Sequence, residues 1–139
     1  MRVLFDTDVT LDLILDREPF AEDAASVFRL HEQGRVKGYI SASTVVNVFY
    51  ITRKAHGLDG ARQAVGELLA GLSVCPTNDL VLQEAYQLFF NDYEDAVQHA
   101  CAVAAGLDAI ITRNLEDYKK ATLPIFSPTD FLSYIKSQP

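Results

Sequence analysis

The chain has 139 residues, and its 12 Lys and Arg against 19 Asp and Glu give a formal net charge of −7. Compact domains cluster around ~100–150 residues, so we expect one domain spanning residues 1–139 rather than two. With 49% hydrophobic and 22% charged residues, the composition is typical of a globular protein and excludes a disordered one. The acidic balance by itself argues against a nucleic-acid partner, because phosphate backbones are normally held by basic surfaces.

The two cysteines, Cys75 and Cys101, form neither a C-x-x-C pair nor a cluster with histidine. This pattern predicts no disulfide framework and no structural zinc site. The first residues reach an acid at Asp6 without the apolar run of a signal peptide, and no stretch approaches the ~18 apolar residues of a membrane span. We therefore expect a cytoplasmic protein that makes no membrane contact.

Apolar runs and helical spacing predict alternating strands and helices from the start of the chain. Val3–Phe5 is typical of a strand buried on both faces, and a helix around Leu11–Leu15 is expected to end before Pro19, which disfavours helical geometry in the residue before it. The pattern next predicts a helix over Phe20–Gln33, a strand over Gly38–Ala42, a helix that Ser43 caps and Gly57 ends, a helix over Ala61–Leu72 and a strand over Leu72–Pro76.

The second half of the chain continues this alternation. The segment Tyr93–Ala105 is apolar almost all round, which indicates a central buried helix. Strands and helices that alternate from end to end predict a three-layer α/β domain, a sandwich of helices around a central, mostly parallel sheet. The other elements expected here are a helix capped by Asn78 or Asp79 that reaches Phe89, a strand over Ala109–Thr112, an edge strand over Leu123–Phe126 and a helix capped by Ser127.

Acids that directly follow strands are the first candidates for a site, because parallel sheets bind ligands at the carboxyl ends of their strands. Asp6 and Asp8 follow the first predicted strand, although Asp8 or Thr10 is equally suited to cap the next helix. Asp12 and Asp16 are expected to be solvated helix positions.

A second acidic cluster opens the predicted central helix. Asp92 or Asn91 is the type of residue that caps a helix, and the first turn of a helix favours carboxylates. Asp95 lies three residues after Asp92, on the same face of a helix that is otherwise apolar. A capping role therefore does not account for Asp95.

A third cluster, Thr112–Asp117, follows the next-to-last predicted strand. Taken alone, it is explained by Thr112 or Asn114 capping a turn, with Glu116 and Asp117 exposed. Three acidic clusters at one sheet edge would repel one another, and none contains a matching run of Lys or Arg. Oxygen ligands favour Mg²⁺ or Mn²⁺ over zinc, so the sequence predicts one of these ions as the counter-charge.

The three clusters, in this order and at this spacing, resemble the motifs of the PIN-domain family over essentially the whole chain. Asp16–Phe20 also resembles one bacterial subgroup of that family. In the three motifs, Asp6–Asp12 resembles the opening D-T-N-V-x-L-D, Asp92–Ala96 resembles the helix start D-F-E-D-A, and Thr112–Asp117 resembles T-R-N-x-x-D.

The resemblance implies a PIN sandwich with a central parallel sheet and the activity of a Mg²⁺- or Mn²⁺-dependent endoribonuclease acting on RNA. Many small stand-alone PIN proteins of bacteria and archaea are VapC-type toxins paired with an antitoxin, and homodimers are common among them. The expected partners are therefore an RNA substrate, an antitoxin protein and a second copy of the chain.

The resemblance also implies roles for single residues. Asp6 and Asp95 match the two carboxylates that hold the metal most directly, and Asp92 and Asp117 match the remaining acids. We expect one of these remaining acids to position a second metal or the attacking water. The polar residues that orient the site are matched by Thr112 and Asn114.

One position departs from the family pattern. The helix after the second strand normally presents a glutamate, and Asn47 stands in its place. An amide can ligate through its carbonyl oxygen, but it brings no negative charge and cannot act as a base. Glu94 and Asp8 are the two acids considered as compensation.

Two alternative functions remain open. The chain can be a catalytically weak PIN domain that serves as an RNA-binding or protein-interaction module, a hypothesis that Asn47 favours. A receiver-like or phosphatase-like pocket would need a phosphoacceptor Asp on a middle strand with a partnering Lys, and the sequence shows no such arrangement.

Other conspicuous side chains are expected to have packing or capping roles. His99 is expected to pack or to cap, and Tyr86, Phe89, Phe90 and Tyr93 are expected to pack in the core or on a dimer face. Six basic residues near the motifs are candidates for holding RNA phosphates, although an ordinary surface charge is the commoner role: Arg17, Arg53, Lys54, Arg113, Lys119 and Lys120.

Overall fold

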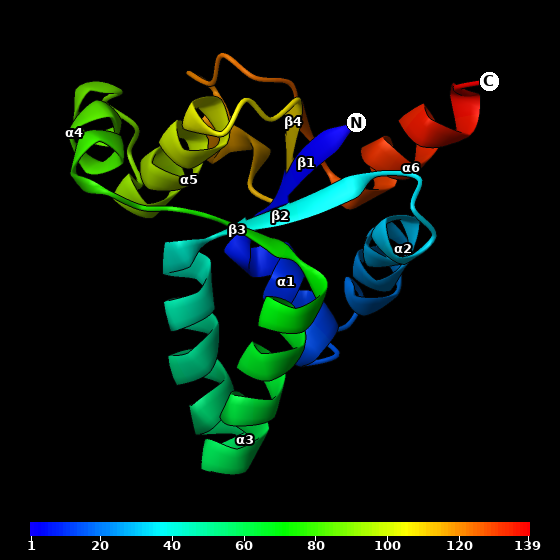
Figure 1. Ribbon diagram of the computed structural model, residues 1–139. Helices are drawn as coiled ribbons and strands as arrows, with labels where there is room; N and C mark the ends of the chain where they lie inside the picture. Colours follow the sequence, from blue (N-terminus) through cyan, green and yellow to red (C-terminus); the bar gives the residue numbers. More distant parts are fainter.

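Five parallel strands form the centre of the molecule, in the order β3-β2-β1-β4-β5. The computed structural model describes residues 1–139, and Figure 1 shows helices on both faces of this sheet. The three-layer α/β architecture expected from the sequence is therefore confirmed. The strands are β1 (Arg2–Phe5), β2 (Lys37–Ser41), β3 (Ser73–Cys75), β4 (Ala109–Ile111) and β5 (Ile125–Phe126).

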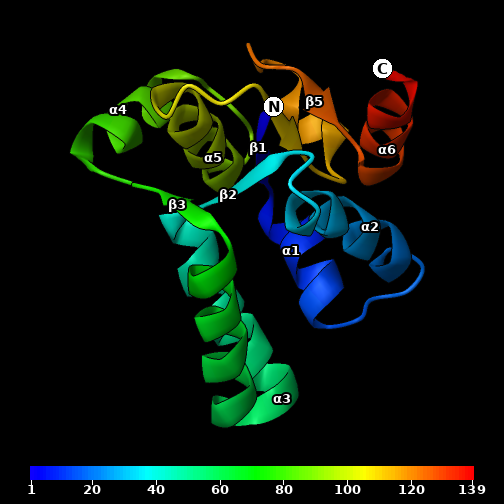
Figure 2. The same ribbon diagram turned by 45° about the vertical axis from the view of Figure 1, so that its right-hand side comes forward.

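The helices divide between the two faces of the sheet (Figures 1 and 2). One face carries α4 and α5, which pack against each other, while α2 and α6 lie together on the opposite face. The helices are α1 (Thr7–Ile14), α2 (Ala21–Glu32), α3 (Ala42–Gly71), α4 (Asp79–Gln87), α5 (Tyr93–Ala104) and α6 (Pro128–Ser137), with a short 3-10 helix, η1, at Leu115–Tyr118.

Each side of the sheet has its own hydrophobic core. Successive side chains of a strand point to opposite faces, and β1 follows this rule. Val3 and Phe5 pack into the core beneath α2, where the ring of Phe5 stacks on Phe28 at a centroid distance of 4.1 Å. Leu4 packs into the second core, under α4 and α5. Strand β1 is therefore buried on both faces, as its apolar run predicts.

Helix α3 is a pair of helical segments that meet at Gly57. This residue has φ +77° and ψ 179°, a conformation that glycine adopts without a steric penalty. The two segments fold back beside each other and extend away from the sheet (Figures 1 and 2). The helix end predicted at Gly57 is therefore confirmed.

Two of the predicted helix caps are wrong. Helix α3 is capped by Ser41, two residues before the expected Ser43, and Asp6 caps α1 in place of Asp8 or Thr10. In both cases the helix begins directly at the strand end, so the polar residue that ends or directly follows the strand is the one available to the first N–H groups of the helix. The caps predicted at Asn78, Asp92 and Ser127 are confirmed. None of the helices combines the length and the apolar composition that a membrane span requires.

The close approach of β2 to β1 leaves no space for a side chain at Gly38. A Cβ atom at this position would collide with the ring of Phe5 and lie 3.1 Å from Leu72 Cδ2. We expect Gly38→Ala to lower the free energy of unfolding by about 1–3 kcal/mol, the usual cost of overpacking a core. Urea unfolding measures this change.

Gly66→Ala is the matched control, because nothing lies within 4 Å of a Cβ atom added at this position in α3. It is expected to raise the free energy of unfolding by about 0.5–1 kcal/mol. Wild-type stability of Gly38→Ala would contradict the packing described for β1 and β2.

Candidate metal centre

The structure brings the three acidic clusters together at the carboxyl ends of β1 and β4. Asp6 directly follows β1, and Thr112 directly follows β4, its partner in the sheet. Asp95 lies in the first turn of α5, which packs over these strands. Segments that are about a hundred residues apart in sequence thus contribute to one site, at the edge where parallel sheets bind ligands.

Three aspartates form the most compact part of this site. One carboxylate oxygen of each of Asp92, Asp95 and Asp117 lies within 4.8 Å of the other two. Asp92 is exposed, Asp117 is half-buried and Asp95 is buried. The cluster therefore extends from solvent into the protein.

Asp95 has an unsatisfied carboxylate oxygen. Only 5% of the residue is exposed, and its Oδ2 atom has no hydrogen-bond partner. Its Oδ1 atom accepts a long hydrogen bond of 3.4 Å from the hydroxyl of Tyr118. A buried carboxylate oxygen without a donor is costly, and a bound cation would satisfy it. An oxygen-only donor set of this kind fits Mg²⁺ or Mn²⁺.

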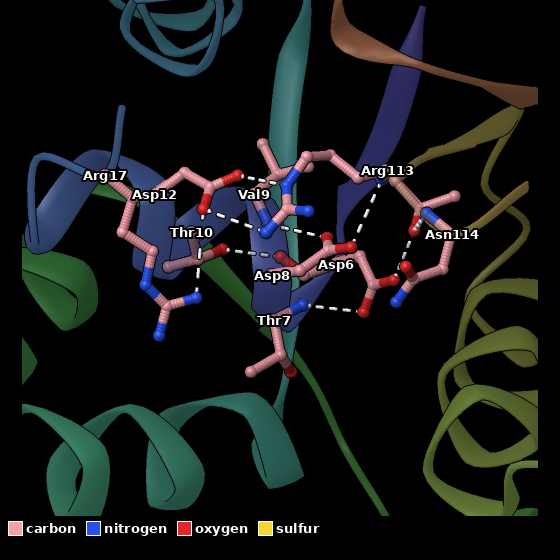
Figure 3. Close-up of polar contacts among 10 residues, drawn as sticks. Asp6, Thr7, Asp8, Val9, Thr10, Asp12, Arg17, Arg113 and Asn114 are labelled. Carbon is pink, nitrogen blue, oxygen red and sulfur yellow. Dashed lines mark hydrogen bonds and ion pairs between the residues drawn. The ribbon is translucent and has the colours of Figure 1, made fainter. Parts of the chain in front are cut away.

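Asp6 is held by neutral donors on both of its oxygens. Oδ1 accepts a hydrogen bond from the backbone N–H of Thr7 (Figure 3). The same oxygen accepts one from Nε2 of Gln98, and Oδ2 accepts one from the hydroxyl of Thr112. Only 2% of Asp6 is exposed. Its carboxylate is therefore fixed in orientation, with no Lys or Arg bonded to it.

Burial and mutual repulsion disfavour ionisation of the carboxylates. Burial is the main cause that raises the pKa of Asp95 to about 8, and the charges of Asp6 and Asp92 add to it. Burial, followed by the charge of Asp6, raises the pKa of Asp8 to about 7. The pKa of Asp6 is also raised by burial, against the hydrogen bonds from Thr112 and Gln98. A divalent cation would offset both the burial and the repulsion, because its positive charge favours the ionised carboxylates.

The expected supporting residues differ in what they contact. Thr112 bonds Asp6, as a residue that orients the site should, and its hydroxyl also accepts the backbone N–H of Asn114. Asn114 is exposed and is linked to the site through its backbone, which donates to Thr112 and accepts the N–H of Asp117 at 3.1 Å. Asn47 donates from Nδ2 to Oε2 of Glu94 at 2.6 Å, not to an aspartate. The turn-capping role considered for Thr112 is thus present together with its contact to Asp6.

Two buried polar residues that the sequence did not single out, Gln98 and Tyr118, also contact the site. Gln98 has no exposed surface and bonds Asp6 while accepting a hydrogen bond from Thr44. Tyr118 is 2% exposed and directs its hydroxyl at Asp95. The available signal was Gln98 itself, a polar residue three positions after Asp95 on an apolar helix.

Asp12 contradicts the prediction of a solvated position. Only 1% of it is exposed, and it accepts hydrogen bonds from Nε and Nη2 of Arg113 at 2.6 and 3.1 Å (Figure 3). The guanidinium of Arg113 also lies 3.9 Å from the centroid of the Phe20 ring. Arg17 approaches Asp12 at 3.8 Å. Arg113 is therefore committed to an internal ion pair and is not a free phosphate contact.

The remaining conspicuous residues mostly have structural contacts. Lys119 pairs with Glu116, and Lys120 donates to the carbonyl oxygen of Phe89. His99 is buried and accepts the backbone N–H of Thr122, as expected for a capping role. Of the four aromatic residues, Phe90 packs on Tyr118 and His99, whereas Tyr86, Phe89 and Tyr93 are exposed. Arg53 and Lys54 are also exposed.

The chain resembles a known family and several solved structures. A family model described as "PIN domain" matches residues 2–116. No curated protein matches the sequence. Among solved structures, VapBC from Salmonella typhimurium bound to DNA matches with a TM-score of 0.73 and 18% identity, covering 92% of this chain and 98% of the other.

Two further structures share the fold. VapBC2 from Rickettsia felis, bound to a fragment of its promoter, has a TM-score of 0.72 and 13% identity, covering 91% of this chain and 98% of the other. VapC20 from Mycobacterium tuberculosis, described as a toxin that cleaves the sarcin-ricin loop, has a TM-score of 0.65 and 14% identity, covering 78% and 86%. At these identities the likeness is one of fold.

The buried ion pair between Asp12 and Arg113 is expected to stabilise the folded protein. Arg113→Ala leaves a buried carboxylate without its main partner, so we expect the free energy of unfolding to fall by about 2–4 kcal/mol, moderated by the nearby Arg17. Lys119→Ala, which removes the same charge from an exposed pair, is expected to cost much less, because water and salt screen that pair. Equal losses in the two variants, measured by urea unfolding, would contradict the buried pair.

The raised pKa values of Asp8 and Asp95 make the stability of the metal-free protein depend on pH. The unfolded chain loses these protons near pH 4, whereas the folded protein keeps them up to about pH 7 and about pH 8. The folded state binds more protons across this range, so its stability falls as the pH rises.

Urea unfolding in the presence of a chelator measures this effect. We expect a lower free energy of unfolding at about pH 8 than at about pH 5.5, and a smaller difference in Asp95→Asn. An equal pH dependence in this variant would show that Asp95 is not the strained acid.

Proposed function

The chain belongs to the PIN-domain family, and we propose that it is a divalent-metal-dependent endoribonuclease that acts as the toxin of a toxin–antitoxin pair. One observation carries the proposal above the others. Asp95 is buried beside Asp92 and Asp117, yet one of its carboxylate oxygens has no donor. A carboxylate kept in this state is suited to a cation that the protein itself does not supply.

The four aspartates would hold the ion. Asp92, Asp95 and Asp117 are within reach of one another, and Asp6 lies close enough for its charge to raise the pKa of Asp95. Thr112 orients Asp6 and thereby supports the site indirectly. Asn114 donates its backbone N–H to Thr112, and Asn47 donates its side-chain amide to Glu94.

Hydrolysis of a phosphodiester needs an activated water and neutralisation of charge on the phosphate. A bound divalent ion supplies both, by lowering the pKa of water and by Lewis-acid stabilisation. The protein orients the acids and excludes solvent from Asp6 and Asp95, while the exposed Asp92 and half-buried Asp117 leave an opening for the substrate. Asp95 must lose its proton for the ion to bind, so metal binding is expected to release protons.

RNA is the proposed substrate, an antitoxin the proposed partner and a homodimer the proposed assembly. Support comes from the family and from structures of similar fold, which include VapBC complexes and a toxin described as cleaving the sarcin-ricin loop. The net charge of −7 fits a substrate that depends on divalent ions for its affinity, since an acidic protein has little attraction for phosphates of its own.

A catalytically weak RNA-binding or protein-interaction module is the second candidate. It is favoured by Asn47, an amide in the place of the family glutamate. Mn²⁺ binding measured by calorimetry separates the two candidates. A nuclease should bind the ion at the aspartates, and a catalytically weak module should not.

RNA cleavage by wild type and Asp95→Asn tests the enzyme. We expect the substitution to lower the cleavage rate in Mg²⁺ or Mn²⁺ by at least ~100-fold, the scale of losing one main electrostatic contribution to a transition state. Glu84→Gln, which removes an equal charge from the exposed face of α4, should cleave like wild type. Equal cleavage rates for Asp95→Asn and wild type would contradict a metal-dependent nuclease site at Asp95.

The same pair of proteins tests the toxin role in bacteria. Induced expression of wild type is expected to arrest growth, and Asp95→Asn should be harmless because it lacks the cleaving activity. Normal growth with an active wild-type nuclease would leave the enzyme assignment standing and remove the toxin role.

A further inference from the structure

Glu94 is an acid that the four-aspartate site does not use, yet its carboxylate is held in place. Oε2 accepts the hydrogen bond of 2.6 Å from Nδ2 of Asn47, and Oε1 accepts one of 3.4 Å from Nε2 of Gln98. The donors lie on two different helices, Asn47 on α3 and Gln98 one turn further along α5. An acid in the first turn of a helix normally extends into solvent, as the exposed Glu116 of η1 does. Glu94 instead points inward, toward α3.

Both donors to Glu94 are neutral amides, and none of the ion pairs of the protein includes it. The same Gln98 amide also bonds Asp6, so the two acids share one donor. Asp95, the next residue in the chain, has the carboxylate oxygen without a partner. Oriented acids without a basic partner, beside an orphaned carboxylate oxygen, are suited to binding a cation.

Asp8, the other acid considered as compensation for Asn47, has different surroundings. Its two oxygens accept the backbone N–H groups of Val9 and Arg113. The positive charge of Arg113 also acts on Asp8. The carboxylate of Asp8 is therefore satisfied within the protein, and Glu94 is the acid that contacts Asn47.

We propose that Glu94 is a further divalent-ion carboxylate of this site and that Asn47 is its positioning residue. The missing charge of α3 is thus supplied from α5, across the contact that joins the two side chains. The proposal rests on the proposed metal-dependent function, because it adds an acid to the same centre. It also accounts for Asn47 without a loss of metal binding.

Exchange of the two groups tests this arrangement. Mn²⁺ alone is titrated into wild type, Glu94→Gln, Asn47→Ala and the double variant Asn47→Glu/Glu94→Gln by calorimetry. Glu94→Gln is expected to weaken Mn²⁺ binding by roughly 10-fold, and Asn47→Ala by less, since it removes the positioning amide and leaves the charge. The double variant returns one carboxylate to the contact and should recover most of the affinity.

The thermal stability of the metal-free proteins separates ion binding from a structural role. Glu94→Gln removes a like charge from an acidic site, so it should melt at or above the wild-type temperature while binding Mn²⁺ less tightly. A lower melting temperature with unchanged Mn²⁺ affinity would assign Glu94 a purely structural role. Glu84→Gln is the control and should match wild type in both measurements.

Asp95→Asn makes the two proposals distinguishable. Loss of Mn²⁺ binding in Asp95→Asn but not in Glu94→Gln would overturn the role of Glu94 alone. A wild-type protein that does not bind Mn²⁺ would overturn both the proposed function and the role of Glu94.

Discussion

The accumulation of carboxylates at the end of β1, without a basic residue to balance most of them, is the constraint on which the site depends. Strand β1 is the middle strand of the sheet, so the residue that follows it is enclosed on all sides. That residue is Asp6, which is buried, and its negative charge adds to the effect of burial in raising the pKa values of Asp8 and Asp95. A globular protein of this size has only a small margin of stability, so acids of this kind are retained at a cost. Their retention is understandable where a cation offsets the repulsion.

A layer of neutral hydrogen-bonding groups makes this arrangement possible. Gln98 and Thr112 bond Asp6 directly, and Thr44 links Gln98 to the start of α3. Neutral donors orient a carboxylate without cancelling its charge, which leaves it free to act on an ion. The one buried acid that does have a basic partner, Asp12, lies on the next turn of α1 and pairs with Arg113. The protein therefore separates an acid that is paired with an arginine and stabilises the fold from acids that have no basic partner and remain available to a cation.

Much of the fold and part of the site could be predicted from the sequence. Asp6 was predictable because it follows an apolar strand, and Asp95 because no capping role explains it. The role of Thr112 came from the resemblance to the family motif. The neighbours of these residues were not predictable, since they depend on how α5 and α3 lie against the sheet. Gln98 meets an acid 92 positions earlier in the chain, and Arg113 meets one 101 positions earlier. Local patterns do not contain such pairings, which is also why Asp12 was expected to be solvated.

Anomalous scattering from crystals grown with Mn²⁺ would show directly whether a divalent ion binds among these carboxylates. We expect an anomalous peak bounded by the carboxylates of Asp6, Asp92, Asp95 and Asp117, with the free oxygen of Asp95 directed at the ion. Fully occupied density for these side chains without an anomalous peak between them would contradict it.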